Sequence, residues 1–174
     1  MLQQLSIRNL TVFHEAHLDF GKHLNVIIGK NGGGKTHLLK LAYSVLASSA
    51  ECRKTNINAD TPTKGVYQTR LANKLVNVFR PDSLGRLVSR RQGRARFDIE
   101  LIFDSTHSDW DVSFGFATNS KSEVDIIKLP CAWVDVSPVY LPTRELLSIY
   151  SNFISVYEGH YLTQVATYQA TKTA

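Results

Sequence analysis

The sequence predicts an α/β fold in which a mixed sheet carries a glycine-rich loop with its helix and is joined by an antiparallel β meander. Three observations predict this fold. A continuously apolar run at 23–29, HLNVIIG, leads into the octet GKNGGGKT at 29–36. Apolar residues at helical spacing follow the octet between 38 and 46. Further along, apolar and polar residues alternate from 97 to 116, as they do in strands with one buried face.

Three strands are expected around the start of the chain. Leu5 and Ile7 share one side of an alternating segment, and a second strand is expected within 11–20. The run at 23–29 is apolar without alternation, which is typical of a strand buried on both faces of a parallel sheet. The helix after the octet is expected to run from about Gly34 to about Ser48.

The rest of the chain divides at its polar segments. Residues 50–65 are rich in turn formers and predict a loop, and 66–79 predict a second helix that ends before Pro81. The turns STHSD and ATNSKSE separate three alternating segments between 97 and 129, which predicts an antiparallel meander. A buried strand is expected at 131–141 and the start of a helix at TRELLSIYSNFI.

Composition places the chain among globular proteins. Of its 174 residues, 43% are hydrophobic and 20% are charged. No run of 18 apolar residues and no secretory signal is present, and two distant cysteines, Cys52 and Cys131, fit reduced thiols. We therefore expect a cytoplasmic protein without a membrane span. The net charge of +5 permits an acidic partner.

The octet has the pattern G-x-x-x-x-G-K-T between an apolar run and a helix. Backbone N–H groups without obstructing Cβ atoms can wrap a triphosphate, and the start of a helix adds further donors. Lys35 can reach the β- and γ-phosphates, and the Thr36 hydroxyl can bind Mg²⁺. The sequence therefore predicts an ATP and Mg²⁺ site. Its expected nucleotide-binding residues are Gly29, Lys30, Asn31, Gly32, Gly33, Gly34, Lys35, Thr36 and His37.

The finer pattern G-x-N-G-x-G-K-T resembles the Walker A motif of ATP-binding-cassette ATPases. Over residues 1–48 the chain resembles the N-terminal lobe of ATPase heads of the SMC, RecF and OLD-like branch, and PTRE near 143 resembles a segment of prokaryotic AAA-family ATP-binding proteins. The resemblance implies a P-loop NTPase fold and weaker nucleotide contacts from Arg8, Asn9 and Phe13. The alternative is that Arg8 lies on a solvated strand face and Phe13 lies in the core.

The resemblance also implies one lobe that lacks a second half. Its expected parts are a nucleotide-binding core at 1–48, a helical and basic insertion at 50–96, a meander at 97–130, and a strand and helix at 131–174. We find no signature loop and no Walker B strand, since Asp104 lies in the meander before Ser105, and Asp135 interrupts its strand. No glutamine lies between Gln92 and Gln164 to serve as a Q-loop residue.

Two features leave alternatives open. Glu145 could act as a catalytic or metal-adjacent acid, or simply belong to the first turn of a helix. Six arginines and one acid lie between 80 and 96, either to contact DNA or as a solvated surface. The expected DNA contacts are Arg86, Arg90, Arg91, Arg94 and Arg96.

Two functions fit these features. The first is the ATP-binding segment of an ABC-type ATPase head, linked to DNA repair, chromosome handling or phage defence, which works as a homodimer or with further ATPase or effector subunits. The alternative is a non-catalytic or truncated module that binds nucleotide or pairs with a full-length ATPase without turnover. An isolated chain of this sequence is expected to bind ATP without hydrolysing it.

Overall fold

The structure, a computed structural model, describes residues 1–55, 61–89 and 95–141. The chain divides into two units, Met1–Tyr140 and Leu141–Ala174. All helices and strands described below belong to the first unit. Glu145 and the helix predicted after Thr143 lie outside the described residues.

Five strands form one sheet in the order β2-β1-β3-β4-β5, and every neighbouring pair is antiparallel. The strands are β1 (Leu2–Leu10), β2 (Phe13–Asp19), β3 (Arg96–Phe103), β4 (Val112–Ala117) and β5 (Asp125–Lys128). The predicted meander is therefore confirmed as β3, β4 and β5. It does not stand apart from the first two strands, because β1 pairs with β3 and joins all five strands into one sheet.

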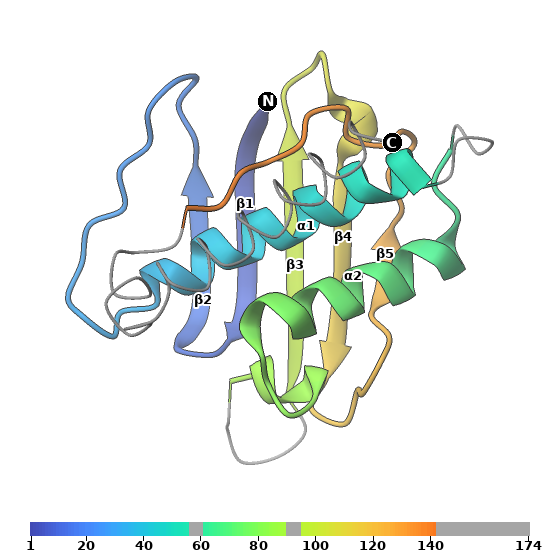
Figure 1. Ribbon diagram of the computed structural model, residues 1–174. Coiled ribbons are helices and arrows are strands. Elements are labelled where there is room, and N and C mark those ends of the chain that lie inside the picture. The colour runs from blue at the N-terminus through green and yellow to red at the C-terminus, as the bar shows by residue number, and fades with distance from the viewer. Residues whose placement is uncertain (56–60, 90–94, 142–174) are drawn as a thin grey trace, which may run out of the picture. The chain divides into compact units, whose positions relative to one another are not determined.

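Two helices cover one face of this sheet (Figure 1): α1 (Lys35–Thr55) and α2 (Lys64–Phe79). Both predicted helices are confirmed, although α1 continues beyond Ser48 to Thr55, so the loop predicted at 50–65 is wrong for its first six residues. Helix α1 continues because Ala50 and Cys52 are also buried, so the C-terminal part of α1 still has apolar surface to cover. Arg53 and Lys54 lie in its last turn, where their positive charges stabilise the helix because that end of the helix dipole is negative.

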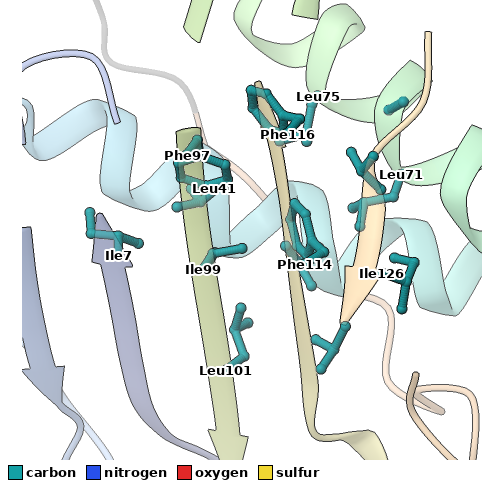
Figure 2. Packing of buried hydrophobic residues seen from close by; sticks show 14 of the residues in the cluster. Ile7, Leu41, Leu71, Leu75, Phe97, Ile99, Leu101, Phe114, Phe116 and Ile126 are labelled. Atoms are coloured by element: carbon teal, nitrogen blue, oxygen red, sulfur yellow. The ribbon is translucent and has the colours of Figure 1, made fainter. Parts of the chain in front are cut away.

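The core lies between the sheet and the helices. One apolar row crosses all five strands through their paired positions: Ala16, Ile7, Ile99, Phe114 and Ile126. Figure 2 shows Leu41 of α1 and Leu71 and Leu75 of α2 among the buried strand residues. Short 3₁₀ helices at Leu84–Leu87 (η1) and Ser108–Trp110 (η2) precede β3 and β4. The opposite face of the sheet is polar and carries no helix in the described part of the chain.

The buried strand predicted at 23–29 is wrong. These residues lie in no strand, and Leu24, Val26 and Ile28 are 84%, 70% and 89% exposed. An apolar run becomes a buried strand only beside other strands, and no described strand pairs with this segment. For the same reason the described sheet is purely antiparallel, without the parallel strands expected of a mixed sheet.

The buried strand predicted at 131–141 is also wrong. Trp133 and Val134 are buried, but no strand forms, and Val139 and Leu141 are exposed. The segment packs on α1 instead: the Val134 N–H donates to Ser49 Oγ at 2.9 Å, and the rings of Tyr140 and Tyr43 lie 5.5 Å apart. No helix in the described part of the chain is long and apolar enough to cross a membrane.

Candidate nucleotide-binding site

The octet forms a tight loop that ends as the first turn of α1. The Gly33 N–H donates to the Lys30 carbonyl at 3.1 Å, which closes the turn. The Gly34 carbonyl accepts from the N–H groups of His37 and Leu38 at 2.8 and 3.1 Å, so the helical hydrogen bonds begin there. No acid lies in the first turn of α1. The positive end of the helix dipole therefore faces the loop without a competing carboxylate.

Two glycines give the loop its shape. Gly32 and Gly34 have φ angles of 78° and 84°, in the left-handed region that disfavours residues with a Cβ. At Gly34 space is also limited, since a Cβ would lie 2.4 Å from Cε2 of Phe13 and 2.6 Å from Cγ2 of Val12. At Gly32 a Cβ would meet nothing within 4 Å. Val12 and Phe13 therefore pack so closely against Gly34 that no side chain fits there.

The loop keeps several backbone donors unpaired. The N–H groups of Gly34, Lys35 and Thr36 donate to no described residue, because the helical bonds begin at His37. Such donors at a helix start bind anions. The residues present thus fit a nucleotide phosphate.

Lys35 folds back over its own loop. Its Nζ donates to the carbonyls of Gly29 and Lys30 at 2.7 and 2.8 Å. The Lys35 ammonium is therefore bound to two carbonyl groups of its own loop, and phosphate oxygens can replace these carbonyls as its partners. An ammonium is a compact point charge with three donors, which suits it to this exchange.

His37 links the loop to the turn between β1 and β2. Its Nδ1 lies 2.8 Å from Oγ1 of Thr11, and its ring lies 5.7 Å from that of Phe79. Burial, and secondarily the charge of Lys40, lower the pKa of His37. The neutral imidazole is therefore favoured at this position.

The turn itself is strained. Asn9 and Thr11 have φ angles of 57° and 45°, and a positive φ is costly for a β-branched residue such as Thr11. Hydrogen bonds fix both residues: Asn9 Nδ2 donates to the Arg96 carbonyl at 2.9 Å, and the Thr11 N–H donates to the Leu87 carbonyl at 2.8 Å. Strain that is held in this way is common at binding sites.

The structure separates the weaker nucleotide candidates. Phe13 lies against Gly34, and Asn9 lies at the base of the same turn. Arg8 instead lies on strand β1 with its guanidinium 3.4 Å from Glu15, and it lines the polar face of the sheet away from the helices. Thr11 and Val12 were not predicted as site residues. The sequence carries no signal for their roles, which depend on the fold of the turn.

The predicted DNA contacts are also separated. Arg86 is exposed in η1, whereas Arg90, Arg91 and Arg94 lie outside the described residues. Arg96 lies on β3, where its guanidinium donates to Asp98 and Asp125 at 2.7 and 2.8 Å. Hydrogen bonds to Asp98 and then Asp125 raise the pKa of Arg96, so its guanidinium stays charged while the two carboxylates offset that charge.

A family model described as an AAA domain matches residues 4–128, which is more than two thirds of the chain. The chain belongs to the AAA domain family. A solved chain from work on "ATP-driven dimerization and DNA stimulated activation of SMC ATPases" aligns with a TM-score of 0.52 and 13% identity. The match covers 90% of this chain and 95% of that one, which confirms the SMC-like P-loop fold.

Two curated relatives are similar over part of the chain. The DNA replication and repair protein RecF of a Picosynechococcus species is 29% identical over 93 residues, covering 53% of this chain and 24% of that protein. RecF of Streptococcus pneumoniae is 33% identical over 57 residues, covering 33% of this chain and 16% of that protein. The predicted resemblance to the SMC and RecF branch is confirmed. The chain spans about a quarter or less of the length of these relatives.

Proposed function

We propose that this chain binds Mg²⁺-ATP at the octet, as the ATP-binding segment of an ABC-type ATPase head. One observation carries the proposal: the glycine loop, which packs against Phe13, presents unpaired N–H groups at the start of a helix whose first turn contains no acidic residue. In this proposal the backbone from Gly29 to Gly34 surrounds the phosphates and Lys35 exchanges its loop carbonyls for phosphate oxygens. ATP supplies the phosphoryl group whose transfer would drive the head.

The proposed metal ligand is Thr36. Its side chain is exposed in the first turn of α1, beside the unpaired donors of the loop. The metal role is tested by titrating ATP with Mg²⁺ and with EDTA. We expect Mg²⁺ to tighten binding to the wild-type chain and to have a smaller effect on Thr36→Ala. An equal Mg²⁺ effect in both proteins would remove Thr36 from the site.

A second candidate function is a module that binds nucleotide without turnover and pairs with another lobe. The exposed apolar residues of two extended segments favour it. In each segment one residue packs inward, Ile27 against the core and Tyr140 against α1, while its neighbours point outward. The outward residues are Leu24, Val26, Ile28, Val139 and Leu141, all at least 70% exposed. Extended apolar segments of this kind pair with strands of another lobe or subunit.

Turnover distinguishes the two functions. Hydrolysis needs groups that orient water and stabilise the transition state, and none of the described residues has been assigned such a role. We expect no phosphate release from the isolated chain, alone or with DNA, in a steady-state assay with Lys35→Ala as the contamination control. Lys35-dependent release would support the catalytic function, and Glu145 would then be the first residue to replace.

Pairing is tested by molar mass in solution. We expect ATP-dependent assembly, either as a homodimer or with an added ATPase or effector subunit, and light scattering after gel filtration measures it. Replacing Val26 and Ile28 by asparagine should weaken assembly without lowering the thermal midpoint, because both side chains are already exposed. Assembly that is unchanged by these replacements would exclude the segment as the interface.

The proposed setting is the cytoplasm, in DNA repair, chromosome handling or phage defence. The relatives named as DNA replication and repair proteins support a link to DNA. Within the predicted arginine run, Arg86, Arg90, Arg91 and Arg94 remain the proposed contacts, since Arg96 is already paired with two carboxylates; the test uses the three that lie closest together in the sequence, Arg90, Arg91 and Arg94. Replacing these three by serine should reduce the salt dependence of DNA binding, and an unchanged slope would show that they are only solvated.

A further inference from the structure

The outward side of α2 is a polar, cationic stripe, which we name the α2 stripe. Its members are exposed; those within α2 recur every three or four residues and share one side of the helix, and Arg80 follows as the residue that caps the C-terminal end of α2. They are Val66, Thr69, Arg70, Asn73, Asn77 and Arg80. The opposite side of α2 holds Tyr67, Leu71 and Leu75 in the core. Figure 1 shows α2 in the helical layer over the sheet, so the α2 stripe faces away from the strands.

The α2 stripe lies in a strongly basic part of the chain. Helix α2 contains no Asp or Glu. The described residues between Glu51 and Ser89 contain seven Lys and Arg and two acids, Glu51 and Asp82. Glu51 is already engaged by the Lys74 ammonium. Arg70 and Arg80 form no ion pair with any residue that the structure describes.

The opposite face of the sheet has a different charge balance. It carries Glu15, Asp98, Glu100 and Asp125 around a shallow hollow of about 280 Å³ and along the neighbouring strands. Its arginines are paired with these acids, Arg8 with Glu15 and Arg96 with Asp98 and Asp125. Uncompensated positive charge therefore gathers on the helical side of the molecule and not on the sheet.

The residue types of the α2 stripe suit a phosphate backbone. Arg, Asn and Thr side chains donate hydrogen bonds to phosphate oxygens, and the α2 stripe contains no carboxylate that would repel them. Arg70 and the C-cap residue Arg80 lie ten residues apart, and a helix rises about 15 Å over ten residues, a length over which duplex DNA presents about nine phosphate charges. Val66 is its one apolar member, so it lacks the apolar face with which a helix enters a membrane.

We propose that the α2 stripe binds the phosphate backbone of duplex DNA without reading its sequence. The choice of DNA rests on the proposed function, whereas the location of the surface rests on the charge and exposure of α2. The α2 stripe lies outside the loop that is proposed to bind ATP. The two sites can therefore be tested separately.

The test measures anisotropy of a labelled 30-base-pair duplex as the salt concentration rises. The variant combines Arg70→Ser with Arg80→Asn, because Arg80 has a φ of 56° and asparagine tolerates that conformation. Loss of two phosphate contacts should lower the slope of log K against log salt by about 1.8. The matched control, Lys22→Ser with Lys121→Ser, removes the same charge from exposed positions outside the α2 stripe and should keep the wild-type slope.

Three results would overturn the proposal. They are no duplex binding by the wild-type chain at low salt, an unchanged slope in the α2 variant, and an equal loss of slope in the control. Arg70→Lys keeps the positive charge and should keep the wild-type slope. That result would show that the loss of slope in the α2 variant comes from the loss of charge. A titration of ATP into the α2 variant should match that of the wild type. If ATP binding fails in both proteins while the slope changes as expected, the proposed function is wrong and the DNA surface stands.

Discussion

Replacing Gly34 by alanine tests whether Val12 and Phe13, at the turn between β1 and β2, pack closely against the nucleotide loop. The new Cβ carries two costs. It must adopt a φ of 84°, a left-handed conformation that costs about 1–2 kcal/mol for a residue with a side chain. It must also displace Phe13 and Val12, from which it would lie 2.4 and 2.6 Å, and overpacking of this kind costs about 1–3 kcal/mol. We therefore expect a loss of about 2–5 kcal/mol in the free energy of unfolding.

The matched control is Gly32→Ala. Its φ of 78° carries a similar conformational cost, but its Cβ would meet nothing within 4 Å. We expect the control to lose only about 1–2 kcal/mol, measured for both variants by urea denaturation. Replacing Phe13 by alanine in the Gly34→Ala background should recover part of the difference. Equal losses in Gly34→Ala and Gly32→Ala would refute the contact between the turn and the loop.

Two further predictions concern the helices. Ser49→Ala removes the acceptor of the buried Val134 N–H and should lower the free energy of unfolding by about 1–3 kcal/mol, measured by urea denaturation. Ser48→Ala is the control and should lower it less, because the Ser48 hydroxyl donates within α1. Equal losses would contradict the role of Ser49 in holding residues 131–141 against α1. The lowered pKa of His37 means that the unfolded chain takes up its proton first, so stability is complete above an unfolded pKa of about 6.5 and falls as the pH drops below it. His37→Gln should flatten this fall between pH 7.5 and pH 5, and an unchanged pH profile would contradict the assignment.

The sequence predicted those features whose signals are local. The octet, both helices and the alternating strands of the meander follow from residue types at fixed spacing, and each forms, although α1 extends to Thr55, past its predicted end. The run at 23–29 was mispredicted because its burial depends on partner strands that are not among the described residues. The strained turn was missed because a positive φ at Thr11 is opposed by its own β-branched side chain and is imposed by the bond to Leu87.

The pairing of charged side chains in the fold could also not be predicted from local sequence patterns. The arginine run appears in the sequence as a single cationic segment. In the fold, Arg96 reaches across β4 to Asp125 on β5, a pairing that no local pattern indicates. It passes over Gly115, where a Cβ would lie 3.0 Å from the Arg96 Nε and 2.5 Å from an Asp98 carboxylate oxygen. The two arginines of the α2 stripe, Arg70 and Arg80, were overlooked for a different reason: they lie far apart in the sequence and come to one surface only when the helix forms.

The most direct test of the central claim is an isothermal titration of Mg²⁺-ATP into the wild-type chain and Lys35→Ala. Lysine 121 serves as the control, because Lys121→Ala removes the same charge from an exposed turn far along the chain from the octet. Loss of a charge-assisted contact to phosphate should weaken binding roughly 10- to 150-fold in Lys35→Ala, with Lys121→Ala unchanged. Equal affinity in the wild-type chain and Lys35→Ala, with both proteins folded by circular dichroism, would contradict the assignment of the octet as the nucleotide site.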